Sequence, residues 1–182
     1  MQKMNKKSPK AICAALALML APGVYAAGTL TGKIGVQLVI GAGCTVNNNS
    51  TAGGTNNWGT LDFGTHSTLT NIIDGTVIGS NGSNGITIVC SEGLTPTLSL
   101  DAGQNGSGST RNLSAGSGGT LIPYRLYSDS ARTSVINPNA PITLANSSQD
   151  LPVYGRVLPE DQSTSSPAAG TYNDIVIATL AW

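Results

Sequence analysis

The sequence is poor in the residues on which most enzymes and nucleic-acid-binding proteins depend. Of its 182 residues only 10% are charged and 4% are aromatic, and His66 is the single histidine. Nine lysines and arginines are balanced by nine aspartates and glutamates, so the charge pattern shows no basic footprint for nucleic acid. The low charge also argues against a disordered tail protein, because such chains owe their disorder to high net charge.

Groups that could carry catalysis or hold a cofactor are equally scarce. Nucleophilic catalysis needs a base beside the nucleophile, and His66 follows Phe63-Gly64-Thr65, where an exposed turn histidine is the better interpretation. The glycines near Gly103 lack the following Lys-Ser/Thr of a phosphate-binding loop. We therefore expect no enzyme, and no cofactor, metal or small-molecule substrate.

Glycine, serine, threonine and asparagine are abundant instead, and the apolar residues stand in short runs. This composition is typical of short strands joined by tight turns. The pattern predicts strands at 61–64, 86–90, 97–100 and 121–127, shorter ones near 134–136, 142–144 and 151–158, and loops at 47–57, 103–119 and 162–170. The loop 103–119 is expected to be mobile and solvated. One all-β domain, an antiparallel sandwich, follows from this pattern.

The N-terminal residues 1–26 have the pattern of a secretory signal peptide. Four lysines lie within residues 1–10, an apolar run follows at 11–21, and small residues precede a cleavage point after Ala26. The run is shorter than the roughly 20 residues that span a bilayer. Cleavage would leave 156 residues in which five basic and nine acidic side chains give a net charge of −4. We expect an exported protein.

Two cysteines remain after this cleavage, Cys44 and Cys90. In an exported chain two cysteines most simply form one disulfide. The alternatives, a metal ligand or a catalytic thiol, lack partners, because His66 is the only histidine and no Cys-x-x-Cys pair is present. A bridge between positions 46 apart would remove about 4 kcal/mol of unfolded-state entropy in the chain-entropy model.

Residues 30–40 carry the clearest pattern in the chain. One face consists of the even positions, which are apolar except for a glycine: Leu30, Gly32, Ile34, Val36, Leu38 and Ile40. A period of two predicts a strand, and Gly41-Ala42-Gly43 follows it as a flexible joint. The pattern leaves two interpretations open. The strand either begins a self-contained sandwich or leaves its own domain to complete the next copy, which would also cover an aggregation-prone apolar edge.

Short motifs follow one another along the rest of the chain. They are the alternating segment ending in Gly-Ala-Gly-Cys44, LDFG at 61–64, the strand into Cys90, YRLYSDSART at 124–133, VYGR at 153–156 and AGTYND at 169–174. In this order and spacing they resemble the spore coat protein U domain family, which includes the pilins of archaic chaperone–usher (Csu-type) pili. The resemblance covers nearly all of residues 27–182. One departure is Trp182, where tyrosine or phenylalanine is expected.

The resemblance implies an incomplete immunoglobulin-like antiparallel β-sandwich that is completed by donor-strand exchange. Residues 27–43 would be the donor strand and hinge, and residues 44–182 the sandwich domain. The donor strand would insert Leu30, Ile34, Val36, Leu38 and Ile40, with Gly32 at a shallow or closely approached point. One wall of the groove, and a main chaperone contact, would be formed by the last strand through Ile175, Val176, Ile177, Leu180 and Trp182.

The resemblance also implies partners and a place of action. Identical or related pilin subunits would join head to tail, helped by a periplasmic pilus chaperone and an outer-membrane usher, into a surface fimbrium that supports attachment and biofilm formation. Two alternatives stay open, a secreted spore or cell-envelope coat protein and a minor adaptor or adhesin subunit of a pilus.

Overall fold

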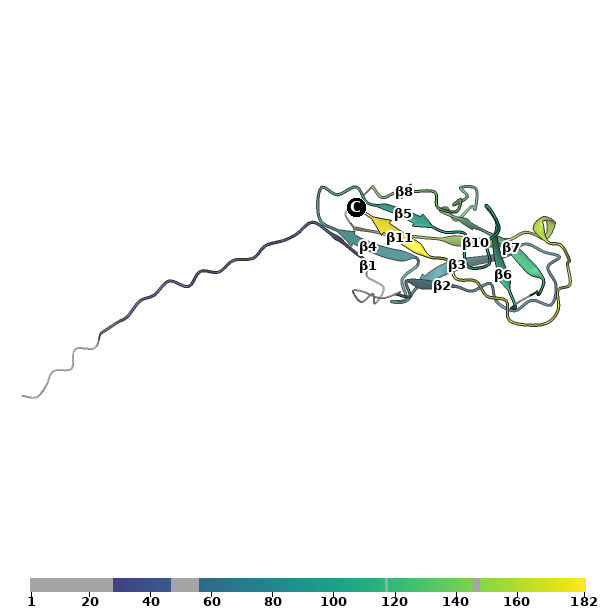
Figure 1. Ribbon diagram of the computed structural model, residues 1–182, viewed down its shortest axis with the longest axis horizontal. Coiled ribbons are helices and arrows are strands. Elements are labelled where there is room, and N and C mark those ends of the chain that lie inside the picture. Colours follow the sequence, from purple (N-terminus) through teal and green to yellow (C-terminus); the bar gives the residue numbers. More distant parts are fainter. Residues whose placement is uncertain (1–27, 47–55, 117, 146–147) are drawn as a thin grey trace, which may run out of the picture. The chain divides into compact units, whose positions relative to one another are not determined.

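The computed structural model describes residues 28–46, 56–116, 118–145 and 148–182 (Figure 1). The expected signal peptide at 1–26 and most of the expected loop at 47–57 lie outside the described residues. The chain divides into two units, residues 1–38 and 39–182. The described residues include no helix long and apolar enough to cross a membrane.

Residues 28–40, named the arm below, belong to no strand in the single chain. The apolar side chains of the alternating face are exposed: Leu30 100%, Ile34 90%, Val36 91%, Leu38 82% and Ile40 83%. A strand is defined by ladder hydrogen bonds to a neighbour, so an alternating sequence by itself does not make one.

The described part of the domain contains eleven strands and one short helical turn. They are β1 (Cys44–Val46), β2 (Gly59–Leu61), β3 (Ile73–Gly79), β4 (Ile86–Cys90), β5 (Thr97–Leu100), β6 (Arg111–Ser114), β7 (Leu121–Tyr127), β8 (Ile142–Thr143), β9 (Ser148–Leu151), β10 (Tyr154–Val157), a 3₁₀ turn at Pro159–Asp161, and β11 (Ala178–Ala181). The expected all-β class is confirmed.

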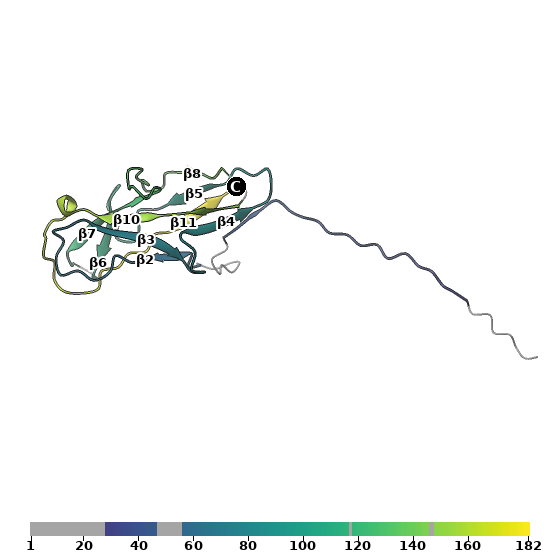
Figure 2. The same ribbon diagram turned by 180° about the vertical axis from the view of Figure 1, so that it is seen from behind.

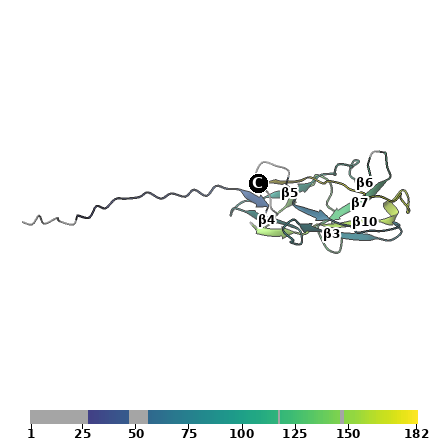
Figure 3. The same cartoon turned by 90° about the horizontal axis from the view of Figure 1, so that it is seen from below.

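Every strand pair in the described domain is antiparallel. The sheets have the orders β1-β4-β9, β2-β3-β10-β7-β6 and β11-β5-β8. Figure 2 shows β2 alongside β3, and Figure 3 shows β5 in one layer of the domain with β3, β4 and β10 in the other. Strands β2 and β11 each form the edge of a sheet, so each presents one side without a neighbouring strand of that sheet.

The apolar face of each main strand points into one core. Ile86 and Ile88 of β4 and Leu98 and Leu100 of β5 are buried at alternate positions, as a half-buried strand requires. The strands expected at 86–90, 97–100 and 121–127 are confirmed.

Pro123 lies within β7, where the sequence suggested an edge or an irregularity. The ladder between β7 and β10 extends only from Tyr127 to Arg125, so it ends before the proline. On its other side Pro123 stands opposite Asn112 of β6. Proline cannot donate to a ladder, and here β10 makes no ladder pair with it.

The expectation of a mobile, solvated loop at 103–119 is wrong for part of that segment. Residues 111–114 form β6, which pairs with β7, and Arg111 and Asn112 are buried. The Arg111 guanidinium donates to three main-chain carbonyls, which satisfies a buried cation. Composition hides this strand because its buried residues are polar.

The expected disulfide is confirmed between Cys44 and Cys90. The two residues stand directly opposite one another in the ladder of β1 and β4, with 4.0 Å between their Cα atoms. Beside them the Ser91 amide donates to the Gly43 carbonyl. The disulfide thus ties the short strand β1 to the longer β4.

Candidate functional site

A groove with a volume of about 740 Å³ opens in the domain. Its lining falls into three groups: an entrance segment with Asn56, Asn57, Trp58, Gly59, Thr60, Leu61 and Phe63; core residues Val77, Ile86, Leu100, Leu113, Tyr124, Leu126 and Val153; and the C-terminal segment from Tyr172 to Ala178. The first group leads through the edge strand β2 and the third leads into the edge strand β11. The groove is therefore an apolar surface bordered by two sheet edges.

The first wall of the groove lies on a strip of glycine. Gly75 of β3 and Gly155 of β10 stand opposite one another in their ladder. A Cβ at Gly155 would lie 2.6 Å from the Leu61 Cδ1 atom and 2.8 Å from the Phe63 Cζ atom. Only glycine lets Leu61 and Phe63 approach this closely. The Phe63 ring also meets Tyr124 edge-on, with 6.0 Å between ring centroids.

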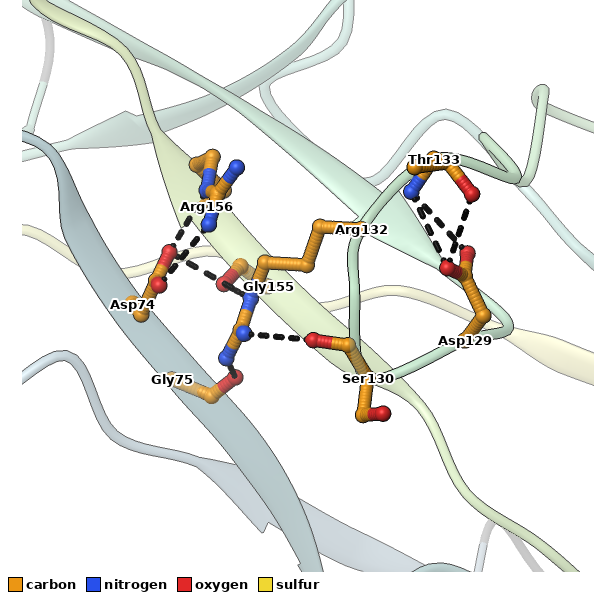
Figure 4. A network of polar contacts seen from close by, with 8 residues as sticks. All are labelled: Asp74, Gly75, Asp129, Ser130, Arg132, Thr133, Gly155 and Arg156. Atoms are coloured by element: carbon orange, nitrogen blue, oxygen red, sulfur yellow. Dashed lines mark hydrogen bonds and ion pairs between the residues drawn. The ribbon is translucent and has the colours of Figure 1, made fainter.

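A polar network holds the same glycine strip (Figure 4). The Arg132 guanidinium donates to the carbonyls of Gly155 and Gly75, each at 3.2 Å. Its Nε atom lies 3.3 Å from the Asp74 carboxylate, which also accepts a 2.7 Å hydrogen bond from Arg156. These arginines hold the pKa of the Asp74 carboxyl below its usual range, the hydrogen bond from Arg156 contributing most.

The turn that presents Arg132 is built by its neighbour Asp129. The Asp129 carboxylate accepts hydrogen bonds from the backbone amides of Thr133 and Ser134, the shorter at 2.6 Å. These amides lower the pKa of Asp129, that of Ser134 most. Arg132 has a φ of 57°, and its guanidinium lies 5.4 Å from the centroid of the Tyr154 ring. The motifs at 124–133 and 153–156 thus meet behind one wall of the groove.

The second wall is the segment that leads into β11. From Tyr172 to Leu180 the even residues are half-buried and the odd residues are exposed. Strand β11 pairs with β5, and the Asp101 amide donates to the Ile177 carbonyl. Odd residues therefore direct their backbone groups toward β5, and the N–H and C=O groups of the even residues point to the open side. This open edge can accept a further strand.

One lining residue of this wall is charged. The Asp174 carboxylate accepts a 2.7 Å hydrogen bond from the Tyr124 hydroxyl and a 3.1 Å hydrogen bond from the Asn105 amide. Burial, together with the bond to Asp174, raises the pKa of Tyr124 above its ordinary value. The tyrosine is therefore a neutral donor to the carboxylate at physiological pH.

The structure places the predicted wall residues differently from one another. Val176 lines the groove and packs against the core, whereas Ile175 and Ile177 also line it but are 53% and 44% exposed. Leu180 packs on the core outside the lining, and Trp182 is 61% exposed. Their predicted contact with a chaperone stays a prediction, as does the donor role of the arm.

Sequence reasoning missed several lining residues, chiefly Trp58, Leu61, Phe63 and Asp174. Trp58 and Phe63 are two of the chain's few large aromatic side chains, and each is followed directly by a glycine. Asp174 occupies an inward position of the final alternating pattern, where a carboxylate is unusual. The aromatic residues before glycine and the inward carboxylate were both visible in the sequence and could have marked these positions.

His66, the histidine of the chain, does not line the groove. His66 is exposed, and its Nε2 atom lies 2.7 Å from the Phe63 carbonyl oxygen. Among the described residues no group of three or more His, Cys, Asp or Glu side chains could hold a metal ion.

A comparison with protein families matches residues 30–179 to the Spore Coat Protein U domain. The chain belongs to this family. It is a structural family and not one of enzymes. No match was found among the curated proteins.

Among solved structures, this member of the Spore Coat Protein U domain family is similar to a chain in the crystal structure of a CsuC–CsuE chaperone–tip adhesion subunit pre-assembly complex from archaic chaperone–usher Csu pili of Acinetobacter baumannii. The two chains are 17% identical with a TM-score of 0.47, over 79% of this chain and 40% of the other. The chain thus spans less than half the length of that relative.

Proposed function

We propose that the protein is a structural subunit that polymerises when the arm of one copy enters the groove of another. The observation that carries this proposal is the coexistence, in one chain, of an exposed alternating apolar arm and an apolar groove bordered by two open sheet edges. Addition of a strand to a sheet edge is a recurring mode of recognition.

The energies support a stable contact. Five apolar side chains of the arm, those other than Gly32 on its even face, are each worth about 1.5–3 kcal/mol when fully buried. Together they supply roughly 8–15 kcal/mol, which is comparable to the whole stability of a domain. Each ladder hydrogen bond to the open side of β11 adds about 0.5–1.5 kcal/mol. An arm seated in the groove would leave slowly.

The symmetry of this contact determines the product. Each copy offers an arm and a groove, which are different surfaces, so the contact is head-to-tail. Heterologous contacts of this kind build open filaments unless the rotation closes a ring. We infer a fibre in which each subunit donates to one neighbour and accepts from the other.

The arm and groove also make the free subunit hazardous, since exposed apolar edges aggregate. We infer that a periplasmic chaperone covers the groove after export, and that an outer-membrane usher exchanges the chaperone for the next arm. The finished fibre would lie on the cell surface and support attachment and biofilm formation.

A second candidate is a coat layer of a spore or cell envelope, favoured by the description of the family itself. It would use the same arm and groove. A stable one-to-one complex with a chaperone, recovered from periplasm, would favour the fibre; its absence alongside cross-linked envelope material would favour the coat.

Deletion of residues 27–40 tests the proposal. The intact processed chain should give a ladder of polymers on unheated SDS gels, because seated arms resist detergent. The deleted chain should give no ladder yet still bind a chaperone, since its groove is untouched. A ladder of normal length from the deleted chain would overturn strand exchange.

A further inference from the structure

The two halves of the C-terminal wall are fixed in different ways. From Ala178 to Ala181 an ordinary ladder joins β11 to β5 and ends at the pair of Ala178 with Leu100. Before Ala178 the chain borders the groove, and separate main-chain hydrogen bonds follow the ladder: the Ile177 and Ile175 carbonyls accept from Asp101 and Gln104, and Asn173 exchanges two bonds with Ser114. Side-chain carboxylates supply the further contacts of this half. The Ile177 amide donates to the Asp101 carboxylate at 2.8 Å rather than to a carbonyl. The groove-lining half is thus held by main-chain bonds at Asn173, Ile175 and Ile177 and, in addition, by carboxylates.

Asp174 is the second of these carboxylates and the only one that lines the groove. It accepts from the Tyr124 hydroxyl at 2.7 Å, from the Asn105 amide at 3.1 Å and from the Asn105 side-chain Nδ2 at 3.2 Å. A Cβ at Gly103 would overlap the carboxylate. The Asp174 side chain is therefore held by Tyr124 of the core strand β7 and by Asn105 of the loop after β5, and it packs against the backbone of that loop at Gly103.

Beneath this loop lies the buried cation Arg111, which is 2% exposed. Its guanidinium donates to the carbonyls of Asp101 at 2.8 Å, Ile136 at 2.7 Å and Leu100 at 3.0 Å. Burial lowers the pKa of Arg111, while Tyr124, Asp101 and Asp174 nearby raise it; an arginine stays charged under such shifts. The Arg111 guanidinium thus holds the loop after β5, which includes Asp101 and whose Asn105 binds the Asp174 carboxylate.

The side chain at position 174 differs in kind from its neighbours on the same face. Asp174 is half-buried, and an apolar side chain there would continue the inward series of Val176 and Ala178. A carboxylate with three donors instead determines where the wall stands. Hydrogen bonds are directional and fix the distance between the groups that they join, whereas apolar contacts do not.

We propose that Asp174 is a positioning residue of the groove, whose carboxylate, bound to Tyr124 and Asn105, sets the gap that the arm enters. This inference rests on the proposed function and adds a residue that determines how firmly the groove holds the arm. Without the carboxylate, the segment keeps its main-chain bonds at Asn173, Ile175 and Ile177 but loses its link to Tyr124 of the core, so that the wall shifts and the ladder to a seated arm weakens.

The test measures how fast preformed polymers release subunits in SDS at a fixed temperature. Three variants of the full processed chain are compared with wild type: Asp174→Ala, Asp174→Asn and Tyr124→Phe. The matched control is Asp161→Ala, which removes a carboxylate bonded twice to Arg125 but outside the groove. Amide exchange at 173–178, read in the same polymers, reports the position of the wall directly.

We expect Asp174→Ala to release subunits at least roughly tenfold faster and to lose amide protection at 173–178, since hydrogen bonds to a charged group are lost. Asp174→Asn, which keeps one acceptor oxygen and loses the other together with the charge, should release subunits at a rate between those of wild type and Asp174→Ala. Tyr124→Phe is the second variant, for the case in which Asp174→Ala does not fold. It should release subunits about three- to tenfold faster than wild type. Asp161→Ala should match wild type.

Equal release by Asp174→Ala and wild type, or by Tyr124→Phe and wild type where Asp174→Ala does not fold, would overturn the inference. So would an equal acceleration in Asp161→Ala, which would reveal a general loss of stability. Absence of polymers from the wild-type chain would refute the proposed function itself, and so the two failures are distinguishable.

Discussion

Residues 30–40 and 172–182 have the same kind of sequence and different structures. Both alternate apolar and other residues with a period of two. In the C-terminal segment the even face is half-buried from Tyr172 to Leu180, and β11 pairs with β5. In the arm both faces are exposed and no strand is assigned.

An alternating sequence therefore shows that a segment can pair as a strand, but a strand forms only where a neighbouring edge is present. The C-terminal segment meets an edge that its own chain provides. The arm carries a larger apolar face, which is the more costly one to leave in water. On the proposed function, the edge that the arm needs is the open side of β11 in another copy.

A charge on the inward face of the arm should abolish assembly. Val36→Asp would place an unpaired carboxylate in an apolar groove, which is strongly unfavourable. Gln37→Asp places the same charge on the outward face and should assemble normally. Polymer ladders of the two variants decide the point: equal behaviour of the pair would show that the face of the arm does not matter.

Loss of the disulfide should be the next largest effect. Cys90→Ser would free β1 from β4 and lower the free energy of unfolding by about 4 kcal/mol in the chain-entropy model. Urea unfolding of the arm-deleted chain measures it. The double variant with Cys44→Ser should match the single one, and a much greater loss in the single variant would point to its free thiol instead.

A side chain on the glycine strip should loosen the first wall. Gly155→Val would force Leu61 and Phe63 from their positions, a case of overpacking that costs about 1–3 kcal/mol. Gly170→Val, at an exposed glycine outside the groove where a Cβ would make only an ordinary contact with Ala115, is the matched control. Urea unfolding should give Gly155→Val a much lower free energy of unfolding than the control variant. The reverse order would contradict this packing.

Acid should weaken the domain slightly through Asp74. Its pKa is lowered in the folded state by Arg156 and Arg132, so its contribution is present above the unfolded value of about 3.9 and is lost as the pH falls through the folded value. The carboxylate is 38% exposed, which limits the effect to less than about 1 kcal/mol. Asp74→Asn should lose less stability than wild type between pH 6 and pH 3; identical losses would exclude this ion pair as a source.

The sequence predicted the elements that apolar alternation marks, among them β4, β5 and β7, and the bridge between Cys44 and Cys90. It did not predict β6, because the buried side chains of that strand, Arg111 and Asn112, are polar and are satisfied by main-chain partners distant in sequence.

The groove was predicted only in part. Alternation marks the C-terminal segment, and the resemblance to the family implied that this segment forms a wall of a groove, whereas the wall of Leu61 and Phe63 depends on two glycines brought together from β3 and β10. The carboxylate of Asp174 is bound by residues about 50 and 69 positions away. Such pairings are decided by the fold and leave no local pattern.

The most direct test of strand exchange is the effect of arm-deleted copies on polymer length. A copy without residues 27–40 can accept an arm but cannot donate one, so it should end any fibre that it joins. Light scattering or electron microscopy of mixtures should show the mean length falling in proportion as the fraction of deleted copies rises, with one deleted copy per fibre at a single end. Fibres of unchanged length, or deleted copies within their interior, would contradict assembly by the arm.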